Sequence, residues 1–250
     1  MAINTAEPNP QSQESEEKRK MEHSIARERL NARAKSRSEK TDETRHRILE
    51  ESIKLFVEQG YEKTTTRQIV QKAGILNGSL YNIYKSKDEI FMDIAKIAFK
   101  EASAVMDQVL GPDPSERQIL CFPTCIQIYA SYRSPRIAEL LSVAHNKWDM
   151  FQYAISFYKD WMTDHAESWE GLIDDPEFDL KLIAFSGSLG SVIKTIAEGA
   201  SPMSEMDCMR VMCSLELRTF GLDDDCPESS IEKIISGLES MDIRICDIRI

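Results

Sequence analysis

The chain has 250 residues, of which 42% are hydrophobic, and a formal net charge of −11 at pH 7. This length allows a small domain beside a larger one with its own core. No run reaches the roughly 18 consecutive apolar residues needed to span a bilayer, and the polar N-terminus lacks an apolar signal core, so we expect a cytoplasmic protein. Such acidity argues against nucleic-acid contact over the whole surface and confines any such contact to a less acidic part.

Residues 1–40 are predicted to be an extension with two different parts. Residues 1–17 are rich in Pro, Gln, Ser and Glu, a composition typical of disorder. Residues 18–40 carry nine Lys and Arg against three acids. They can act as a basic arm on nucleic-acid phosphates or in a minor groove, or remain a solvated tail. Met21 is an alternative start of the chain.

Residues 42–102 are predicted to form a small helical domain whose charges nearly balance. An apolar stripe over residues 48–56 predicts a first helix that ends at Gly60. Thr65 and Gln68 form a capping-box pattern at the start of a second helix. Gly74 is a natural end for that helix, because glycine tolerates the left-handed backbone of a C-terminal cap.

A third short helix is predicted over residues 78–84, with Asn77 as its cap. Leu80 and Ile83, three residues apart, are expected to face inward. The turn residues Ile75 and Leu76 are expected to dock into the core. Together the second and third helices form a helix-turn-helix pattern over residues 65–84.

A long helix is predicted to begin at a second capping box, Ser86 to Glu89, and to end at Gly111. The remainder of residues 103–250 reads as a helical domain without a useful strand signal. Its predicted helices cover residues 114–132, 135–147, 149–171, 177–198, 204–220 and 228–240. Residues 91–250 hold twenty-seven acids against fourteen basic residues, so the acidity lies away from the helix-turn-helix.

Small residues are concentrated in residues 182–197 of the predicted helix over 177–198. Ala184, Gly187 and Ser191 share one helical face. Glycine inside a helix costs about 1 kcal/mol against alanine, so a packing reason is expected. We interpret this face, with the helix over 204–220, as a two-fold four-helix dimer interface. Close packing within one subunit is the alternative.

Aromatic and Met side chains are concentrated over residues 129–169, and they predict a pocket for an apolar or aromatic effector. For any one of these side chains, ordinary core packing is the alternative. The candidate lining residues are Tyr129, Trp148, Phe151, Phe157 and Trp161.

The six cysteines lack paired C-x-x-C spacing, and only four histidines are present. We interpret the cysteines as mostly buried thiols, with neither a disulfide framework nor a metal site. A redox pair of Cys121 and Cys125 is a weaker alternative. Dinucleotide, phosphate-loop, zinc-protease and nucleophile-elbow motifs are absent. The chain is therefore expected to be neither an enzyme nor a cofactor protein, with an enzyme on a helical scaffold as the competing hypothesis.

The span Thr44–Phe91 resembles the DNA-binding domain of the TetR family of transcriptional regulators. The matching positions occur in order over about fifty residues: Ile48 to Phe56, Gly60-Tyr61, Thr64-Thr65, Ile69, Ala73-Gly74-Ile75, Gly78-Ser79-Leu80-Tyr81 and Tyr84 to Phe91. Ile83 departs from the family, which usually has His or an aromatic residue there that touches a phosphate. Val70 replaces a common Ala.

This resemblance implies roles for individual residues. Thr65 and Arg67 would meet phosphates at a helix N-terminus. Lys87 would be a further phosphate contact, and Gly78 would let the backbone approach DNA. The positions that would face the major groove are Asn77, Ser79, Tyr81 and Asn82. Tyr81 and Tyr84 would touch a phosphate or a thymine methyl. Tyr84 in the core and Thr65 as a cap alone are the alternatives.

The resemblance also implies an all-α homodimer that binds a double-stranded DNA operator through two reading helices roughly 34–36 Å apart. It implies a transcriptional regulator, more often a repressor than an activator, that a small-molecule effector releases from DNA. The alternatives are a DNA-binding dimerisation factor that needs no effector, and an activator. Under this hypothesis the basic residues 18–40 would compensate for the contact missing at Ile83.

Overall fold

The computed structural model describes residues 35, 38–112, 114–165, 173, 175–222, 228–246 and 248–249. Contacts divide the chain into two units, residues 1–47 and residues 48–250. In the first unit, the described residues 38–47 are helical. Most of the predicted extension, including nearly all of the basic segment 18–40, lies outside the described residues. The second unit holds the elements below.

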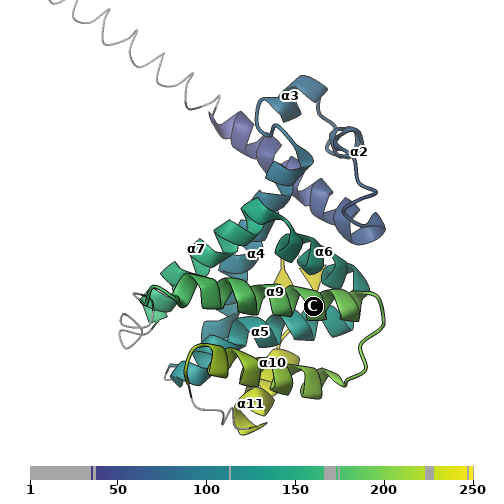
Figure 1. Ribbon diagram of the computed structural model, residues 1–250. Coiled ribbons are helices and arrows are strands. Elements are labelled where there is room, and N and C mark those ends of the chain that lie inside the picture. The colour runs from purple at the N-terminus through teal and green to yellow at the C-terminus, as the bar shows by residue number, and fades with distance from the viewer. Residues whose placement is uncertain are drawn as a thin grey trace, which may run out of the picture. The chain divides into compact units, whose positions relative to one another are not determined.

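The N-terminal part of the second unit is a set of short helices followed by a long one (Figure 1). Residues 48–59 are helical, and α2 (Thr66–Lys72), α3 (Asn77–Tyr81) and α4 (Lys87–Leu110) follow. The predicted capping box forms at Thr65. The Thr65 side chain accepts the backbone N–H of Gln68, and the Gln68 side chain accepts the backbone N–H of Thr65. Ser86 caps α4, and Gly111 ends it with φ +78°. The predicted domain boundary at residues 102 and 103 falls within α4.

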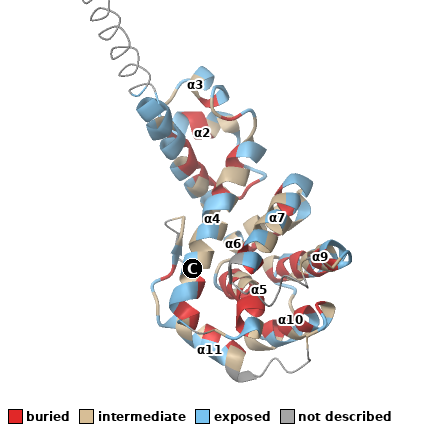
Figure 2. Ribbon diagram, turned by 90° about the vertical axis from the view of Figure 1, so that its left-hand side faces the viewer, coloured by how far each residue is buried: buried red, intermediate tan, exposed pale blue. Residues whose placement is uncertain are grey.

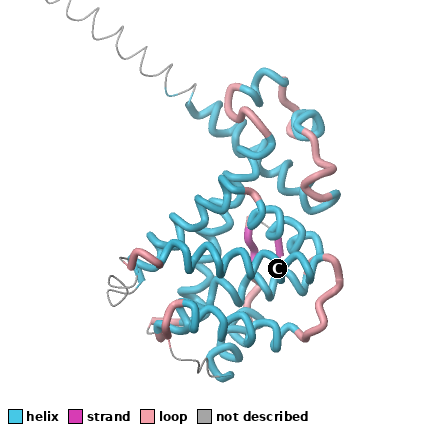
Figure 3. Tube along the Cα trace, in the orientation of Figure 1, coloured by secondary structure: helices cyan, strands magenta, loops and turns pink. Residues whose placement is uncertain are grey.

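The remaining described elements are six helices and a small hairpin (Figure 3). The helices are α5 (Glu116–Arg133), α6 (Pro135–Asn146), α7 (Trp148–His165), α9 (Phe178–Ala197), α10 (Glu205–Thr219) and α11 (Glu228–Glu239). The all-α prediction is confirmed. An antiparallel pair, β1 (Arg244–Ile245) and β2 (Ile248–Arg249), was not predicted, since two-residue strands carry no readable alternation.

Buried side chains form two hydrophobic clusters, which Figure 2 marks in red. The first surrounds Phe56, Tyr61 and Phe91, whose ring centroids lie 4.8–5.5 Å apart. It includes Leu80 of α3, so the short helix is held by its inward residue. The second cluster joins α5, α9, α10 and α11. Within it, α9 packs against α5, α6 and α10.

Helix α9 is long and apolar enough to cross a membrane by length and composition alone. The expectation from apolar runs did not anticipate this, because charged residues interrupt the stretch. Core helices meet the same criteria, and Leu182, Phe185, Leu189 and Ile193 of α9 are buried in the second cluster. We therefore describe α9 as a core helix.

Two details of the turn before α3 differ from the prediction. Leu76, rather than Asn77, is the N-cap residue, and no side chain caps this helix. Leu76 is also 78% exposed instead of docking into the core. Of the two turn residues, only Ile75 packs partly against the first cluster, which Leu80 joins from α3.

Candidate nucleic-acid interface and buried cavity

The turn between α2 and α3 depends on Gly74, whose φ is +62°. The Gly74 N–H donates to the Gln71 carbonyl at 3.3 Å, and the Ile75 N–H donates to the Val70 carbonyl at 3.2 Å. These bonds satisfy the last carbonyls of α2 and reverse the chain within two residues. The turn therefore presents α3 as a separate helix directly after α2.

Helix α3 exposes a mixed polar and aromatic surface. Asn77, Gly78 and Asn82 are exposed, Ser79 is half-buried, and Tyr81 is 55% exposed. A Cβ added at Gly78 would have no neighbour within 4 Å. Amide and hydroxyl groups of this kind can pair with base edges or phosphates. Leu76 adds an exposed apolar side chain at the start of α3, suited to a thymine methyl, and the sequence reading missed it.

The N-terminus of α2 adds an exposed basic residue to this surface. Thr65 and Arg67 are both exposed there. The Thr65 hydroxyl accepts the Gln68 N–H at 3.3 Å, so its capping role is present in the free protein. Arg67 is better suited than Thr65 to a phosphate contact, because a guanidinium can form paired hydrogen bonds with phosphate oxygens.

Tyr84 and Lys87 occupy more enclosed positions than the other candidate residues. Tyr84 is 4% exposed, and its hydroxyl donates to Asp93 Oδ2 at 2.7 Å, which favours the core alternative. Lys87 Nζ donates to the carbonyls of Tyr61 and Thr64 at 2.7 and 2.9 Å. The ammonium also lies 4.0 Å from the Tyr61 ring centroid, and desolvation lowers the pKa of Lys87. The hydrogen bonds of Lys87 thus stabilise the turn before α2.

The first turn of α4 is also tied to the junction of α6 and α7. Asp88 accepts hydrogen bonds from Lys147 at 2.6 Å and from the Tyr61 hydroxyl. These two bonds hold the pKa of Asp88 below its usual value, the bond from Lys147 contributing most. Lys147 is the C-cap residue of α6 and immediately precedes α7. A shift of this junction would therefore be transmitted to the start of α4.

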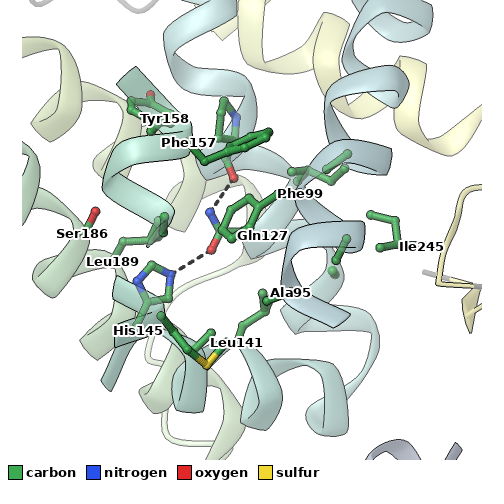
Figure 4. A pocket seen from close by; sticks show the side chains of 18 of the residues that line it. Ala95, Phe99, Gln127, Leu141, His145, Phe157, Tyr158, Ser186, Leu189 and Ile245 are labelled. Carbon is green, nitrogen blue, oxygen red and sulfur yellow. Dashed lines mark hydrogen bonds between the residues drawn. The ribbon is translucent and has the colours of Figure 1, made fainter. Parts of the chain in front are cut away.

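A cavity of about 250 Å³ lies among α4, α5, α6, α7 and α9 (Figure 4). Its lining is largely apolar and includes three predicted residues, Phe151, Phe157 and Trp161. Phe56, Phe91 and Ile94 of the first cluster also line it. One wall of the cavity is thus formed by the same side chains that support the helix-turn-helix.

Two predicted lining residues lie outside the cavity wall. Tyr129 is buried in the second cluster, where the Arg133 guanidinium carbon lies 3.3 Å from its ring centroid. Trp148 is 65% exposed and stacks on Phe151 with ring centroids 6.0 Å apart. Helical spacing groups aromatic residues correctly but does not show which side of a helix faces a hollow.

Gln127 and His145 provide the first polar pair of the cavity (Figure 4). The Gln127 amide nitrogen donates to the Pro123 carbonyl at 3.0 Å, which directs its oxygen to His145 Nε2 at 2.9 Å. Because that oxygen can only accept, Nε2 carries the proton. Desolvation lowers the pKa of His145 to about 4. The imidazole is therefore neutral near pH 7, with Nδ1 as an acceptor.

Gly190 of α9 explains how His145 fits so closely. A Cβ at Gly190 would lie 2.6 Å from His145 Cβ. By contrast, a Cβ at Gly187 would meet nothing within 4 Å. The two glycines of this helix therefore differ: Gly190 admits a neighbour within the subunit, whereas Gly187 lies on an open face.

Glu216 of α10 provides a second polar group at the cavity wall, although it is only 1% exposed. Its two oxygens accept from the Thr124 hydroxyl at 2.8 Å and the Tyr158 hydroxyl at 3.2 Å. Burial, followed by the Glu216 charge, raises the pKa of Tyr158 well above its usual value. Sequence reasoning missed Gln127, His145 and Glu216, because single polar residues in apolar helices carry no periodic signal.

Residues 48–94 match the family model described as bacterial regulatory proteins, tetR family. This match covers both helices of the helix-turn-helix and the first turns of α4. Residues 48–94 are therefore similar to the DNA-binding domain of tetR-family regulatory proteins.

The curated proteins that this chain is similar to are transcriptional regulators. YvkB of Bacillus subtilis (strain 168), an uncharacterised helix-turn-helix regulator, is 23% identical over 132 residues, or 53% of this chain and 65% of its own. The repressor KstR2 of Mycolicibacterium smegmatis (strain ATCC 700084 / mc(2)155) is 33% identical over 72 residues, 27% of this chain and 35% of its own. The chain thus spans less than two thirds of these relatives.

Solved structures of tetR-family proteins are similar at lower identity. The tylP regulator from Streptomyces fradiae aligns with 82% of this chain and 94% of its own, at 18% identity and a TM-score of 0.47. A gamma-butyrolactone receptor aligns with 81% of this chain and 100% of its own, at 17% identity and a TM-score of 0.45.

The predicted dimer residues share an open face. Ala184, Gly187 and Ser191 are all exposed on α9. On the neighbouring α10, Val211 and Leu215 are 47% and 41% exposed. Two packed helices thus present small and apolar side chains to solvent in the isolated subunit.

Proposed function

We propose that this protein is a homodimeric transcriptional repressor that binds a DNA operator and is released from it by a small-molecule effector. The observation that carries the proposal is the exposed, polar and aromatic surface of α3 within a tetR-family domain. Repressors among the curated relatives support the direction of regulation. DNA binding implies that the protein works in the cytoplasm.

In this proposal the major-groove contacts come from Asn77, Ser79, Tyr81 and Asn82. Thr65 and Arg67 bind phosphates beside them, and Gly78 permits close backbone approach. Lys87 acts mainly by holding the turn that presents α2, because its ammonium already binds two carbonyls. Tyr84 supports α3 from inside the core.

Dimerisation through α9 and α10 would bury the open face of each subunit. Exposed small residues on α9 allow close helix approach, and Val211 and Leu215 supply apolar area. A two-fold axis would bring the same four helices together and set the separation of the two α3 helices.

The effector would occupy the cavity beside Gln127 and His145. A volume of about 250 Å³ suits a compact apolar molecule with one hydrogen-bonding group, since typical drug-sized pockets measure about 300–1,000 Å³. Such a molecule would press on Phe91 and Ile94 of α4 and on the helices flanking Lys147. A coupling free energy of about 1–3 kcal/mol would reduce operator affinity roughly 5–150-fold.

Fluorescence anisotropy with DNA from upstream of the protein's own gene tests the proposal. We expect saturable binding of this DNA, and competitor DNA of scrambled sequence should not displace it. The affinity for the DNA should fall as the salt concentration rises. A panel of medium-chain alcohols, ketones and phenols, added at constant salt, should include a compound that both raises the melting temperature and releases the DNA.

Two results would change this assignment. Equal affinity for operator and scrambled DNA would contradict sequence-specific regulation. Specific DNA binding that no compound alters, together with no thermal stabilisation, would favour the effector-independent dimerisation factor. Gln127→Leu provides a control for the cavity, because it removes the polar anchor without touching α3.

A further inference from the structure

Three cysteines and one glutamate meet inside the second cluster, on two helices that pack against each other. Cys121 and Cys125 lie one turn apart on α5, and Cys213 and Glu216 lie three residues apart on α10. Both spacings place two side chains on one helical face. The ligand atoms of Cys121, Cys213 and Glu216 lie within 4.8 Å of one another, and all three residues are buried.

We propose that Cys121, Cys213 and Glu216 bind a thiophilic divalent metal ion such as Zn²⁺, with Cys125 as the fourth ligand. Cys125 Sγ lies 3.5 Å from Cys213 Sγ. In a tetrahedral zinc site with Zn–S bonds of about 2.3 Å, sulfur atoms lie roughly 3.8 Å apart. Cys121, Cys213 and Glu216 thus form the core of the site, and Cys125, which lies beside Cys213, would have to turn its side chain toward the ion to complete it.

Two neighbouring hydroxyls hold the carboxylate in position for this role. Thr124 donates to one oxygen of Glu216 at 2.8 Å, and the Tyr158 hydroxyl lies 3.2 Å from the other, sharing its single proton with the Leu120 carbonyl at 3.1 Å. Each oxygen keeps a second lone pair that can face an ion. Hydrogen bonds to a ligating carboxylate are a regular part of protein metal sites, because they fix its orientation.

The cavity gives an ion a route to the cluster. Thr124 and Glu216 both line the cavity. The Glu216 carboxylate therefore lies between the apolar cavity and the cysteines of the proposed site. Binding would displace the thiol protons to solvent and leave thiolates on the metal. Affinity should therefore rise with pH. This inference rests on the fold alone and does not depend on DNA binding or on an organic effector.

The 3.5 Å approach of Cys125 and Cys213 has a competing meaning, which is a disulfide formed by an external oxidant. In the structure neither Cys125 nor Cys213 forms a disulfide. A metal and a disulfide give different products: the metal protects both thiols from alkylation reversibly, whereas the disulfide persists after chelation and disappears on reduction.

Cobalt titration of the reduced, chelator-treated full-length protein is the direct test. We expect one Co²⁺ per chain, with thiolate-to-cobalt charge-transfer absorption and the visible bands of tetrahedral coordination, and Zn²⁺ should displace the cobalt. Cys213→Ala should weaken binding by at least about tenfold, since even loss of an outer hydrogen-bond partner commonly costs 10–100-fold in affinity.

Cys208→Ala is the matched control, because Cys208 is also buried on α10 but is not one of the candidate ligands. It should bind Co²⁺ like the unaltered chain. Absence of the charge-transfer band in the unaltered protein would overturn the proposal without reference to any variant. Equal loss of binding in both variants, or a chelator-resistant Cys125–Cys213 disulfide with no bound Co²⁺ or Zn²⁺, would also overturn it.

Discussion

Tyr81 and Tyr84 lie three residues apart but have opposite surroundings. Tyr81 is 55% exposed on α3, whereas Tyr84 is 4% exposed and hydrogen-bonded to Asp93. Sequence resemblance assigned both to DNA. The structure separates the two residues physically, because only the side chain of Tyr81 is available to a partner in the free protein.

Tyr81→Ala should weaken operator binding by about 1–3 kcal/mol, as expected for loss of one groove or phosphate contact, and should leave stability nearly unchanged. Tyr84→Ala should destabilise the fold by about 3–5 kcal/mol, as large-to-small core substitutions with aromatic residues do. Anisotropy and urea unfolding measure the two effects. A Tyr81→Ala protein with full operator affinity would contradict the reading role of α3.

His145 makes stability depend on pH. Its pKa of about 4 in the folded chain lies below its ordinary value of 6.5, so the unfolded chain binds the proton more readily. Stability is therefore fully present above pH 6.5 and is lost as pH falls toward 4.

His145→Gln should remove this dependence. Between pH 7 and pH 5 the unaltered protein should lose up to about 2 kcal/mol more stability than the variant, since one pKa unit corresponds to about 1.36 kcal/mol. Urea unfolding at both pH values gives the difference, and contributions from the shared carboxylates cancel. Parallel pH profiles would show that His145 is not buried in a neutral form.

At the scale of elements, local signals in the sequence located helix starts well. The capping box predicted at Thr65 forms where α2 begins, and Ser86 caps α4 as predicted, although Glu89 accepts the Lys85 N–H and so does not complete a second box. The predicted bounds of the other body helices also lie close to those observed, whereas residues 166–171 of the helix predicted over 149–171 lie outside the described residues. The start of α3 was predicted less well, since Leu76 holds the cap position without a capping side chain.

Thr65→Ala should destabilise the DNA-free protein by about 1 kcal/mol, the usual cost of losing an N-cap. Thr66→Ala, one residue further along α2, is the matched control and should cost less, because Thr66 makes no capping bond. Thermal unfolding without DNA separates this effect from any phosphate contact. Equal destabilisation by both substitutions would contradict the capping role.

At the scale of the whole molecule, the open face of α9 and α10 is the feature that one subunit leaves uncovered. Leu215→Asp should place a charge in the proposed interface and shift the protein toward monomers. Operator affinity should fall with it, because one subunit reads only half of a two-fold site.

Analytical ultracentrifugation, with circular dichroism to confirm folding, measures this shift. Ile97→Asp is a suitable control, since Ile97 is 37% exposed on α4 and lies outside α9 and α10. Dimers that persist in Leu215→Asp would exclude this face as the interface.

The helical class and the helix-turn-helix follow from the sequence alone. The sequence also separates an acidic body from an N-terminal helix-turn-helix domain in which acidic and basic residues nearly balance. These features follow from helix caps, apolar periodicity and charge distribution, each of which can be read from residues that lie close together in the sequence. The basic segment 18–40 and its arm stay a prediction, because it lies almost entirely outside the described residues.

Which side chains line the cavity, and which lie side by side in the core, could be seen only in the tertiary structure. Phe151, Phe157 and Trp161 line the cavity while Trp148 does not, and Cys125 lies beside Cys213, 88 residues away. Such contacts depend on how α5, α7 and α10 rotate about their axes when they pack. That rotation is set by the combined burial of many side chains, which no single segment of the sequence encodes.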